Sequence, residues 1–251
     1  MKYLKEFATT AQYEAYTADT ANFITPNVSI CNDNPTVVHY NPYDPYNGYE
    51  YVDLGLSVKW AKCNVGAESE TDYGLYFQWG DTSGYTADEV GSGSGKKAFD
   101  LTDYKYWTAD TGSGSSGFIK YNSTDGKTVL DPSDDAATVN MGGNWRMPTE
   151  SEFNELINNT NYEWTTVNGV YGVMFTSKKS GFTDKYVFFP AAGICYGGTH
   201  NNAGSYGIVW SSSLNALDVN AGRRLHFHNG NRDMDSSVRS RGVSVRGVSV
   251  G

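Results

Sequence analysis

Cysteine is scarce in this 251-residue chain, and no stretch of it is both long and apolar. The three cysteines, Cys31, Cys63 and Cys195, are odd in number and lack C-x-x-C spacing, so we expect no disulfide framework, metal site or cofactor. The N-terminus lacks the apolar core of a signal peptide, and no run is long enough to insert into a membrane. The protein is therefore expected either to act inside the cell or to reach a phage virion or the bacterial cell surface by another route.

Positive charge is also in short supply. The formal net charge is −9, which argues against a nucleic-acid partner. Before Arg223 the only arginine is Arg146, so the C-terminal part is locally basic within an acidic protein. What the chain has in quantity is tyrosine (19) and glycine (28), a composition typical of many turns and of wet cores or binding surfaces.

Residues 1–45 are expected to form a separate small attachment domain. Its pattern predicts a helix over 9–18 and two short strands, over 27–31 and 36–40. The proline-containing segment 41–48 is expected to be a linker, because proline removes a backbone donor and favours extended backbone.

From residue 46 onward the pattern predicts one larger domain that reaches residue 251. Segments 51–60 and 73–80 have the composition of strands, whereas 83–128 is rich in Gly, Ser, Thr and Asp and is expected to form surface loops. Tyr104, Tyr106 and Trp107 would hold these loops to the body.

Thr149 and Glu152 have the spacing of a capping box, so a helix is expected over 150–158. Strands are predicted over 170–177, 186–189, 207–212, 224–228 and 244–250, and Asn229-Gly230 indicates a hairpin with a type I′ turn. Short strands, long loops and few helices together predict an irregular α+β fold. The duplicated RGVSV at 241–245 and 246–250 leaves open which copy is a strand and which is an extension or added sequence.

Six motifs in this order resemble the fibrobacter-type major paralogous domain. They are YVDLGLSVKWA (51–61), LDPSDDAA (130–137), GNWRMPT (143–149), FPAAG (189–193), WSSS (210–213) and GVSVR (242–246). The resemblance covers about residue 49 to the end and implies a C-type-lectin-like fold. That fold also carries the variable proteins of diversity-generating retroelements, in which Asn codons are randomised at their adenines and cannot become Lys, Glu, Gln, Met or Trp codons.

The composition of the C-terminal part is consistent with such randomisation. The last Lys, Glu and Gln are Lys185, Glu163 and Gln78. Over 194–246 only Trp210 and Met234 lie outside the reachable residues, and both suit invariant core positions. The alternative is a polar lectin-like sheet that happens to lack Lys and Glu.

Strand alternation predicts which side chains of this region meet a ligand. Leu225, Phe227 and Met234 should point inward, and Arg232, with Asp233 or Asp235, should lie near solvent. The predicted variable surface consists of Tyr196, Thr199, His200, Asn202, Ile208, Asp218, Gly222, Arg224, His226, His228, Arg232, Asp235, Ser237, Arg239 and Arg241.

Some residues allow other interpretations. His226 and His228 could hold a metal, but no nearby Glu or Cys completes a ligand set. Arg223 and Arg224 could contact an acidic partner or form a solvated strand edge. Asp134 and Asp135 could be catalytic carboxylates, although a turn and helix start after Pro132 explains them better. The Glu-Pro-Asn-like and Trp-Asn-Asp triplets of calcium-dependent lectins are missing, which argues against calcium-dependent sugar binding.

The sequence therefore predicts a non-enzymatic receptor-binding protein for an unknown protein or glycan ligand on a cell surface, attached to a phage or surface structure through residues 1–45. The first alternative is a carbohydrate-binding or adhesion module with a constant surface. The second is an enzyme like the formylglycine-generating enzymes, which share the broad fold and depend on cysteine chemistry; here only Cys195 lies in a suitable loop.

Overall fold

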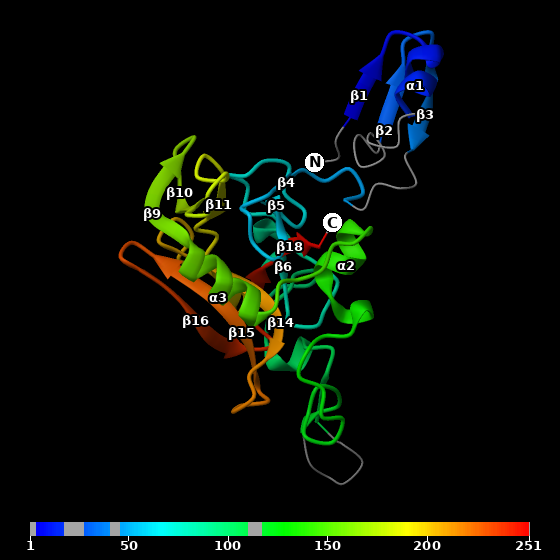
Figure 1. The fold of residues 1–251 in the computed structure, drawn as a ribbon. Coiled ribbons are helices and arrows are strands. Elements are labelled where there is room, and N and C mark those ends of the chain that lie inside the picture. Colours follow the sequence, from blue (N-terminus) through cyan, green and yellow to red (C-terminus); the bar gives the residue numbers. More distant parts are fainter. Residues whose placement is uncertain (1–3, 18–27, 41–45, 110–116, 251) are drawn as a thin grey trace.

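The computed structural model describes residues 4–17, 28–40, 46–109 and 117–250 (Figure 1). At the N-terminus β1 (Leu4–Phe7) pairs in parallel with β2 (Val28–Cys31), which pairs antiparallel with β3 (Asn34–Tyr40). Helix α1 (Thr10–Thr17) begins where the Asp33 carboxylate accepts from the Thr10 amide at 2.8 Å. The predicted helix and both strands are confirmed, β1 was not predicted, and residues 41–45 of the predicted linker lie outside the described residues.

The rest of the chain is a mixed α+β structure with many short strands, as predicted. Three antiparallel or mixed sheets make up most of it. The largest has the order β16-β15-β14-β17-β6, formed by β6 (Tyr76–Phe77), β14 (Tyr206–Leu214), β15 (Ala221–His228), β16 (Asn231–Val238) and β17 (Val243–Ser244). The second, β18-β5-β4, is formed by β4 (Tyr51–Val52), β5 (Lys59–Asn64) and β18 (Arg246–Ser249). The third, β11-β10-β9, is formed by β9 (Thr160–Val167), β10 (Val170–Ser177) and β11 (Tyr186–Pro190).

Smaller elements connect these sheets. Two short hairpins are formed by β7 (Trp107–Thr108) with β8 (Gly117–Phe118) and by β12 (Ile194–Tyr196) with β13 (Thr199–Asn201). The helices are η2 (Ala87–Glu89), η3 (Leu101–Asp103), η4 (Pro132–Asp134), α2 (Ala136–Met141) and α3 (Glu150–Asn159).

Helix α3 begins as its sequence predicts. The Thr149 hydroxyl accepts from the Glu152 amide at 3.3 Å, and the Glu152 carboxylate accepts from the Thr149 amide at 2.8 Å. This reciprocal cap satisfies two backbone donors that a helix start otherwise leaves without partners. Phe153 and Leu156, three residues apart, are fully buried, so α3 covers one face of the β14–β16 sheet and lies in front of it in Figure 1.

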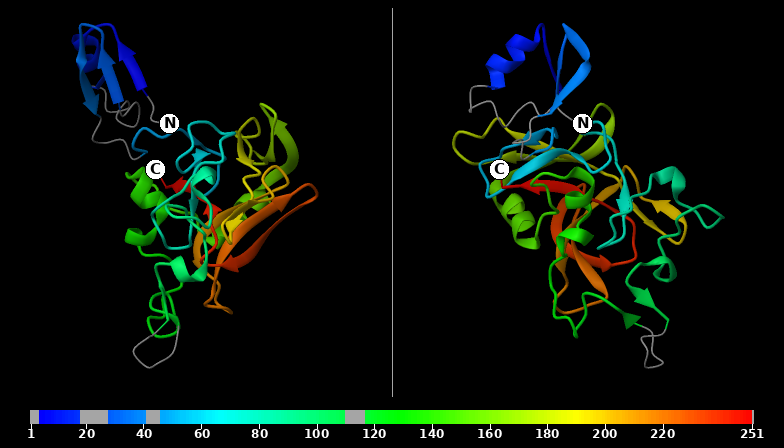
Figure 2. Two further views of the ribbon diagram at one scale, coloured as in Figure 1. Left: turned by 180° about the vertical axis from the view of Figure 1, so that it is seen from behind. Right: turned by 90° about the vertical axis from the view of Figure 1, so that its right-hand side faces the viewer.

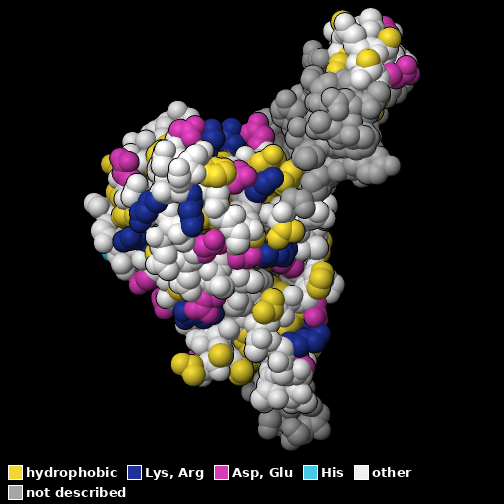
Figure 3. Space-filling view, viewed as in Figure 1, with side chains coloured by type: hydrophobic (Ala, Val, Ile, Leu, Met, Phe, Trp, Pro, Cys, Tyr) yellow, Lys and Arg dark blue, Asp and Glu magenta, His cyan; other side chains and the backbone are white. Residues whose placement is uncertain are grey.

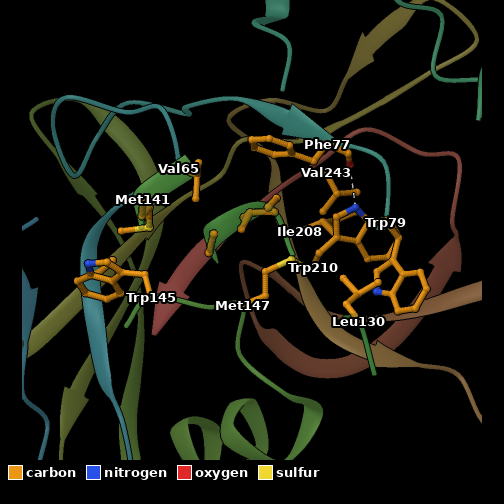
Figure 4. Close-up of a cluster of buried hydrophobic side chains, with 14 of the residues drawn as sticks. Val65, Phe77, Trp79, Leu130, Met141, Trp145, Met147, Ile208, Trp210 and Val243 are labelled. Carbon is orange, nitrogen blue, oxygen red and sulfur yellow. Dashed lines mark hydrogen bonds between the residues drawn. The ribbon is translucent and has the colours of Figure 1, made fainter. Parts of the chain in front are cut away.

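Two hydrophobic cores lie on opposite faces of β14. Val209 belongs to the core beneath α3, together with Leu225 and Phe227 of β15. Ile208 and Trp210 point the other way, into a core that contains Trp79 and Val243 (Figure 4). We call it the β6-side core, because it also contains Phe77 of β6. The Trp210 Nε1 donates to the Phe77 carbonyl at 2.9 Å, so this large ring is buried with its polar atom satisfied. Strand β14 is therefore fixed from both sides.

Both copies of the duplicated RGVSV are structural. The first supplies β17, whose Val243 lies in the β6-side core, and the second supplies β18, whose Val248 lies in the core beneath α3. Arg246 is fully buried and donates to Asn64 Oδ1 and to three carbonyls at 2.8–3.0 Å. The single strand predicted over 244–250 is wrong, because β17 and β18 join different sheets. Neither copy is an appended extension.

The described parts of the Gly- and Ser-rich segment 83–128 are held to the body by tyrosines, as predicted; residues 110–116 lie outside the described residues. Tyr104 is buried and its hydroxyl donates to the Trp79 carbonyl at 2.6 Å. Burial alone would raise the pKa of Asp134, but hydrogen bonds from Lys120, Tyr106 and Tyr121 outweigh it and hold that pKa well below its usual range. Asp134 is thus a structural junction between this segment and η4.

Candidate functional site

The hairpin of β15 and β16 carries the best candidate binding surface. Its register pairs Arg224 with Asp235, His226 with Asp233 and His228 with Asn231. Directly paired residues project to the same side of an antiparallel sheet, so these six side chains share one side while Leu225 and Phe227 enter the core on the other. In the view from behind, no helix crosses this hairpin (Figure 2, left).

The predicted hairpin is confirmed, but its predicted turn type is wrong. Gly230 has a φ of +101°, whereas Asn229 is not among the described residues with positive φ. A type I′ turn requires positive φ at both central positions. The two-residue turn therefore has another geometry, although it preserves the register that places the paired side chains together.

We call this side of the hairpin, with its neighbours on adjoining strands, the polar face. Tyr206 of β14 pairs with His228 and extends the face across the sheet. Tyr196 and Arg241 lie at its edge. The polar face is therefore defined as Tyr196, Tyr206, Arg224, His226, His228, Asn231, Asp233, Asp235 and Arg241.

On the polar face, basic side chains of β15 lie opposite acidic side chains of β16. Arg224 Nη2 lies 2.9 Å from Asp235 Oδ2, and its Nε donates to the Ser236 carbonyl at 3.2 Å. His226 Nδ1 lies 3.6 Å from Asp233 Oδ1. Burial lowers the pKa of His226, and the positive charge of Arg224 lowers it further. The His226 ring is therefore neutral near pH 7 and can both donate and accept a hydrogen bond.

The edge of the polar face is built by the β12–β13 hairpin. The Cys195 amide donates to the Gly242 carbonyl at 2.8 Å, and the Cys195 carbonyl accepts from the Gly242 amide at 2.9 Å. These two bonds fix β12 beside the turn that carries Arg241. The Arg241 guanidinium lies 3.9 Å from the centre of the Tyr196 ring. A stacked arginine on an exposed tyrosine presents both an apolar surface and free donors.

Three predicted contact residues are buried and cannot meet a ligand. Ile208 lies in the β6-side core (Figure 4). A Cβ on Gly222 would lie 2.6 Å from Trp79 Cδ1, so only glycine fits there. Arg239 is fully buried, donates to the Lys120 and Tyr121 carbonyls and lies 3.8 Å from the centre of the Phe118 ring. Its position after the end of β16 carries it under the 117–121 segment, which sequence alone does not indicate.

Arg232 was assigned to the wrong side of the hairpin. It lies two residues from the inward-pointing Met234, and alternation places both on the same face. The register confirms this, because Arg232 pairs with the buried Phe227. Its guanidinium lies 5.0 Å from the centre of the Tyr162 ring, away from the polar face.

The other predicted residues divide between exposed and structural positions. His200 is half-buried, and its Nε2 lies 2.8 Å from both the Tyr76 hydroxyl and the Ala192 carbonyl, so it holds β13 to the body. Thr199 is exposed and pairs with Tyr196 in the β12–β13 hairpin, and Asn202 is exposed beside Tyr206. Ser237 continues the polar face on β16. Asp218 is exposed in the β14–β15 turn, beyond the end of the polar face.

Three residues of the polar face were not in the predicted set: Tyr206, Asp233 and Asn231, which pairs with His228. Tyr206 packs edge-on against His226 with ring centres 5.4 Å apart, and its hydroxyl accepts from Asn202 Nδ2 at 2.5 Å. Asp233 is exposed beside His226. The period of two along β16 could have found Asp233 from Asp235, whereas Tyr206 requires the β14–β15 register.

Two of the groups that the sequence offered for catalysis, Cys195 and Asp135, are buried. Burial raises the pKa of the Cys195 thiol to about 12, so it does not supply a thiolate nucleophile near pH 7. Asp135 caps α2, accepting from the Thr138 amide at 2.9 Å, as expected for a helix start. Within the described residues, no group of three or more His, Cys, Asp or Glu side chains is placed to bind a metal ion.

Comparison with known proteins identifies no relative: no family model, curated protein or solved structure matches the chain. In the part of the chain that the structure describes, none of the helices combines the length and the apolar character needed to cross a membrane.

Proposed function

We propose that this chain is a non-enzymatic binding protein with a C-type-lectin-like fold, whose polar face binds a protein or glycan ligand on a cell surface. The proposal rests on one observation: Tyr, Arg and His side chains lie together on one side of a hairpin whose other side packs against the core beneath α3. Tyr and Arg dominate binding hot spots because they combine large contact area with directed hydrogen bonding.

The support beneath the polar face favours this function. Leu225 and Phe227 are fully buried from the same strand whose alternate residues form the face. On the polar face Asp233 and Asp235 each keep 51% of the side chain exposed, whereas His226 keeps 23% and Arg224 12%. The backbone that carries these side chains is ordered before a ligand arrives. A pre-ordered surface lowers the entropy cost of binding.

We further propose that the outward positions over 194–246 are diversified. Trp210 is fully buried and Met234 packs against the core beneath α3, so both residues that adenine randomisation cannot produce occupy framework positions. The locus provides the test. A template repeat that differs only at adenines, together with a reverse-transcriptase gene, is expected; a locus without both contradicts this proposal.

The binding proposal is tested with labelled protein on a panel of bacterial cells and a glycan array. Any specific hit should weaken about tenfold or more in Arg224→Ala and in Tyr196→Ala, as for hot-spot residues. Tyr171→Ala is the control, because Tyr171 is 51% exposed but lies on β10, outside the polar face. A hit on cells that ignores the polar-face variants contradicts the proposal.

The same panel separates the alternatives. A constant-surface carbohydrate module would give one strong glycan hit shared by all natural variants of the chain. An enzyme of the formylglycine-generating kind would convert a cysteine-containing sulfatase peptide, a reaction that the raised pKa of Cys195 disfavours. Residues 1–45 are proposed to attach the protein to a phage or surface structure, and their deletion should leave ligand binding intact.

A further inference from the structure

A second surface, unrelated to the polar face, contains a groove with a volume of about 640 Å³. It is formed by β4 with the residues before it, by Lys62 of β5, and by the loop that leads into β11. In Figure 1 these elements lie below β1–β3, in the upper part of the main body, whereas β15 and β16 lie at the lower left. The volume lies in the range of roughly 300–1,000 Å³ that is typical of sites for small ligands.

Aromatic rings line much of this groove. Tyr49, Tyr51, Phe182 and Tyr186 all contribute, and Tyr186 is 39% exposed. Phe182 is held in place by Gly55, where an added Cβ would lie 2.5 Å from the ring. The groove thus offers pre-positioned flat apolar surfaces within a polar setting.

The charged groups of the groove are arranged mainly as ion pairs. Glu50 Oε2 lies 2.8 Å from Lys62 Nζ, and Asp184 Oδ2 lies 2.7 Å from Lys185 Nζ. Asp53 and Glu70 also line the groove and leave it with an excess of negative charge. Figure 3 shows charged side chains of both signs beside hydrophobic ones over this upper part of the body.

We propose that this groove binds a neutral oligosaccharide. The C–H faces of sugar rings pack on aromatic rings, while hydroxyl groups donate to carboxylates and accept from ammonium groups, and the groove provides all three partners. Its excess of carboxylates repels an anionic ligand. Its two paired lysines line the same space and make it a poor site for a run of positive charges. No covalent step is involved.

The test measures binding of cellohexaose, xylohexaose, mannohexaose and maltohexaose to the full chain by saturation-transfer NMR and calorimetry. At least one is expected to bind, with the signal transferred from aromatic protons. Tyr186→Ala and Phe182→Leu should each weaken that binding about fivefold or more, the loss expected when one stacking contact is removed. The melting temperature and near-UV circular dichroism of each variant verify that it folds.

Tyr171→Ala is the control, because it removes a tyrosine that is 51% exposed on β10 and belongs neither to the groove nor to the polar face, so it should leave oligosaccharide binding unchanged. The proposal is overturned if none of the four probes binds at about 5 mM, a concentration that detects even millimolar affinity. It is also overturned if hexalysine or trigalacturonate binds more tightly, or if folded Tyr186→Ala and Phe182→Leu bind as well as the unaltered chain.

Discussion

Arg239 offers the sharpest test of the boundary between framework and surface in the C-terminal region. Its guanidinium donates to the Tyr121 carbonyl at 3.0 Å and to the Lys120 carbonyl at 3.2 Å, and it lies 3.8 Å from the centre of the Phe118 ring. Burial lowers the pKa of Arg239, yet a guanidinium retains its proton throughout the physiological range. The change proposed is Arg239→Met, which keeps most of the side-chain volume.

The expected loss follows from these contacts. Each hydrogen bond to a charged group contributes about 1.5–3 kcal/mol, and a desolvated cation–π contact contributes about 2 kcal/mol. The desolvation of the charge, which methionine avoids, offsets part of that sum. We therefore expect Arg239→Met to lower the free energy of unfolding by about 3 kcal/mol.

The assay is urea unfolding monitored by tryptophan fluorescence, since Trp60, Trp79, Trp145 and Trp210 are fully buried. Arg241→Met is the control; that half-buried arginine stacks on Tyr196 and should lose less than about 1 kcal/mol. Equal losses in the two variants, or no loss in Arg239→Met, would refute the assignment of Arg239 to the framework.

Two further predictions concern the same sheet. Gly222→Ala should destabilise the fold by about 1–3 kcal/mol, because the added Cβ would meet Trp79. Ser237→Ala, on the paired strand, should have little effect. The urea unfolding midpoints of the two variants test this, and equal midpoints would contradict the steric argument. The lowered pKa of His226 means that the unfolded chain binds its proton more tightly. Stability should therefore be full above about pH 6.5 and fall as the pH drops toward the folded pKa, with a weaker fall in His226→Gln. Identical pH profiles for the two proteins would exclude His226 as a source of the effect.

Local patterns predicted much of the framework. The capping box at Thr149 located α3, and alternation located β10, β11 and the β15–β16 hairpin, because these signals depend on neighbours a few residues away. The division of 244–250 between two sheets was not predictable, since both copies of RGVSV have the same local pattern and differ only in their long-range partners.

The same distinction explains the outcome at the polar face. Arg224, His226 and His228 were placed correctly because one strand's periodicity decides their side. Arg239 is polar and close to a turn, so its sequence indicates exposure. Its burial depends on carbonyls of residues 120 and 121, more than a hundred residues earlier, which no local pattern contains.

The scaffold of the polar face also depends on the two strands that follow it in the chain. β17 and β18 belong to separate sheets, and without Arg246 the carbonyls of Ala61 and Phe188 would lose their buried donor. A frameshift anywhere between β12 and β16 would scramble both strands and prevent both cores from closing. A chain shifted out of frame in this region would therefore lose the scaffold together with the polar face, whereas a substitution on the face leaves both strands unchanged.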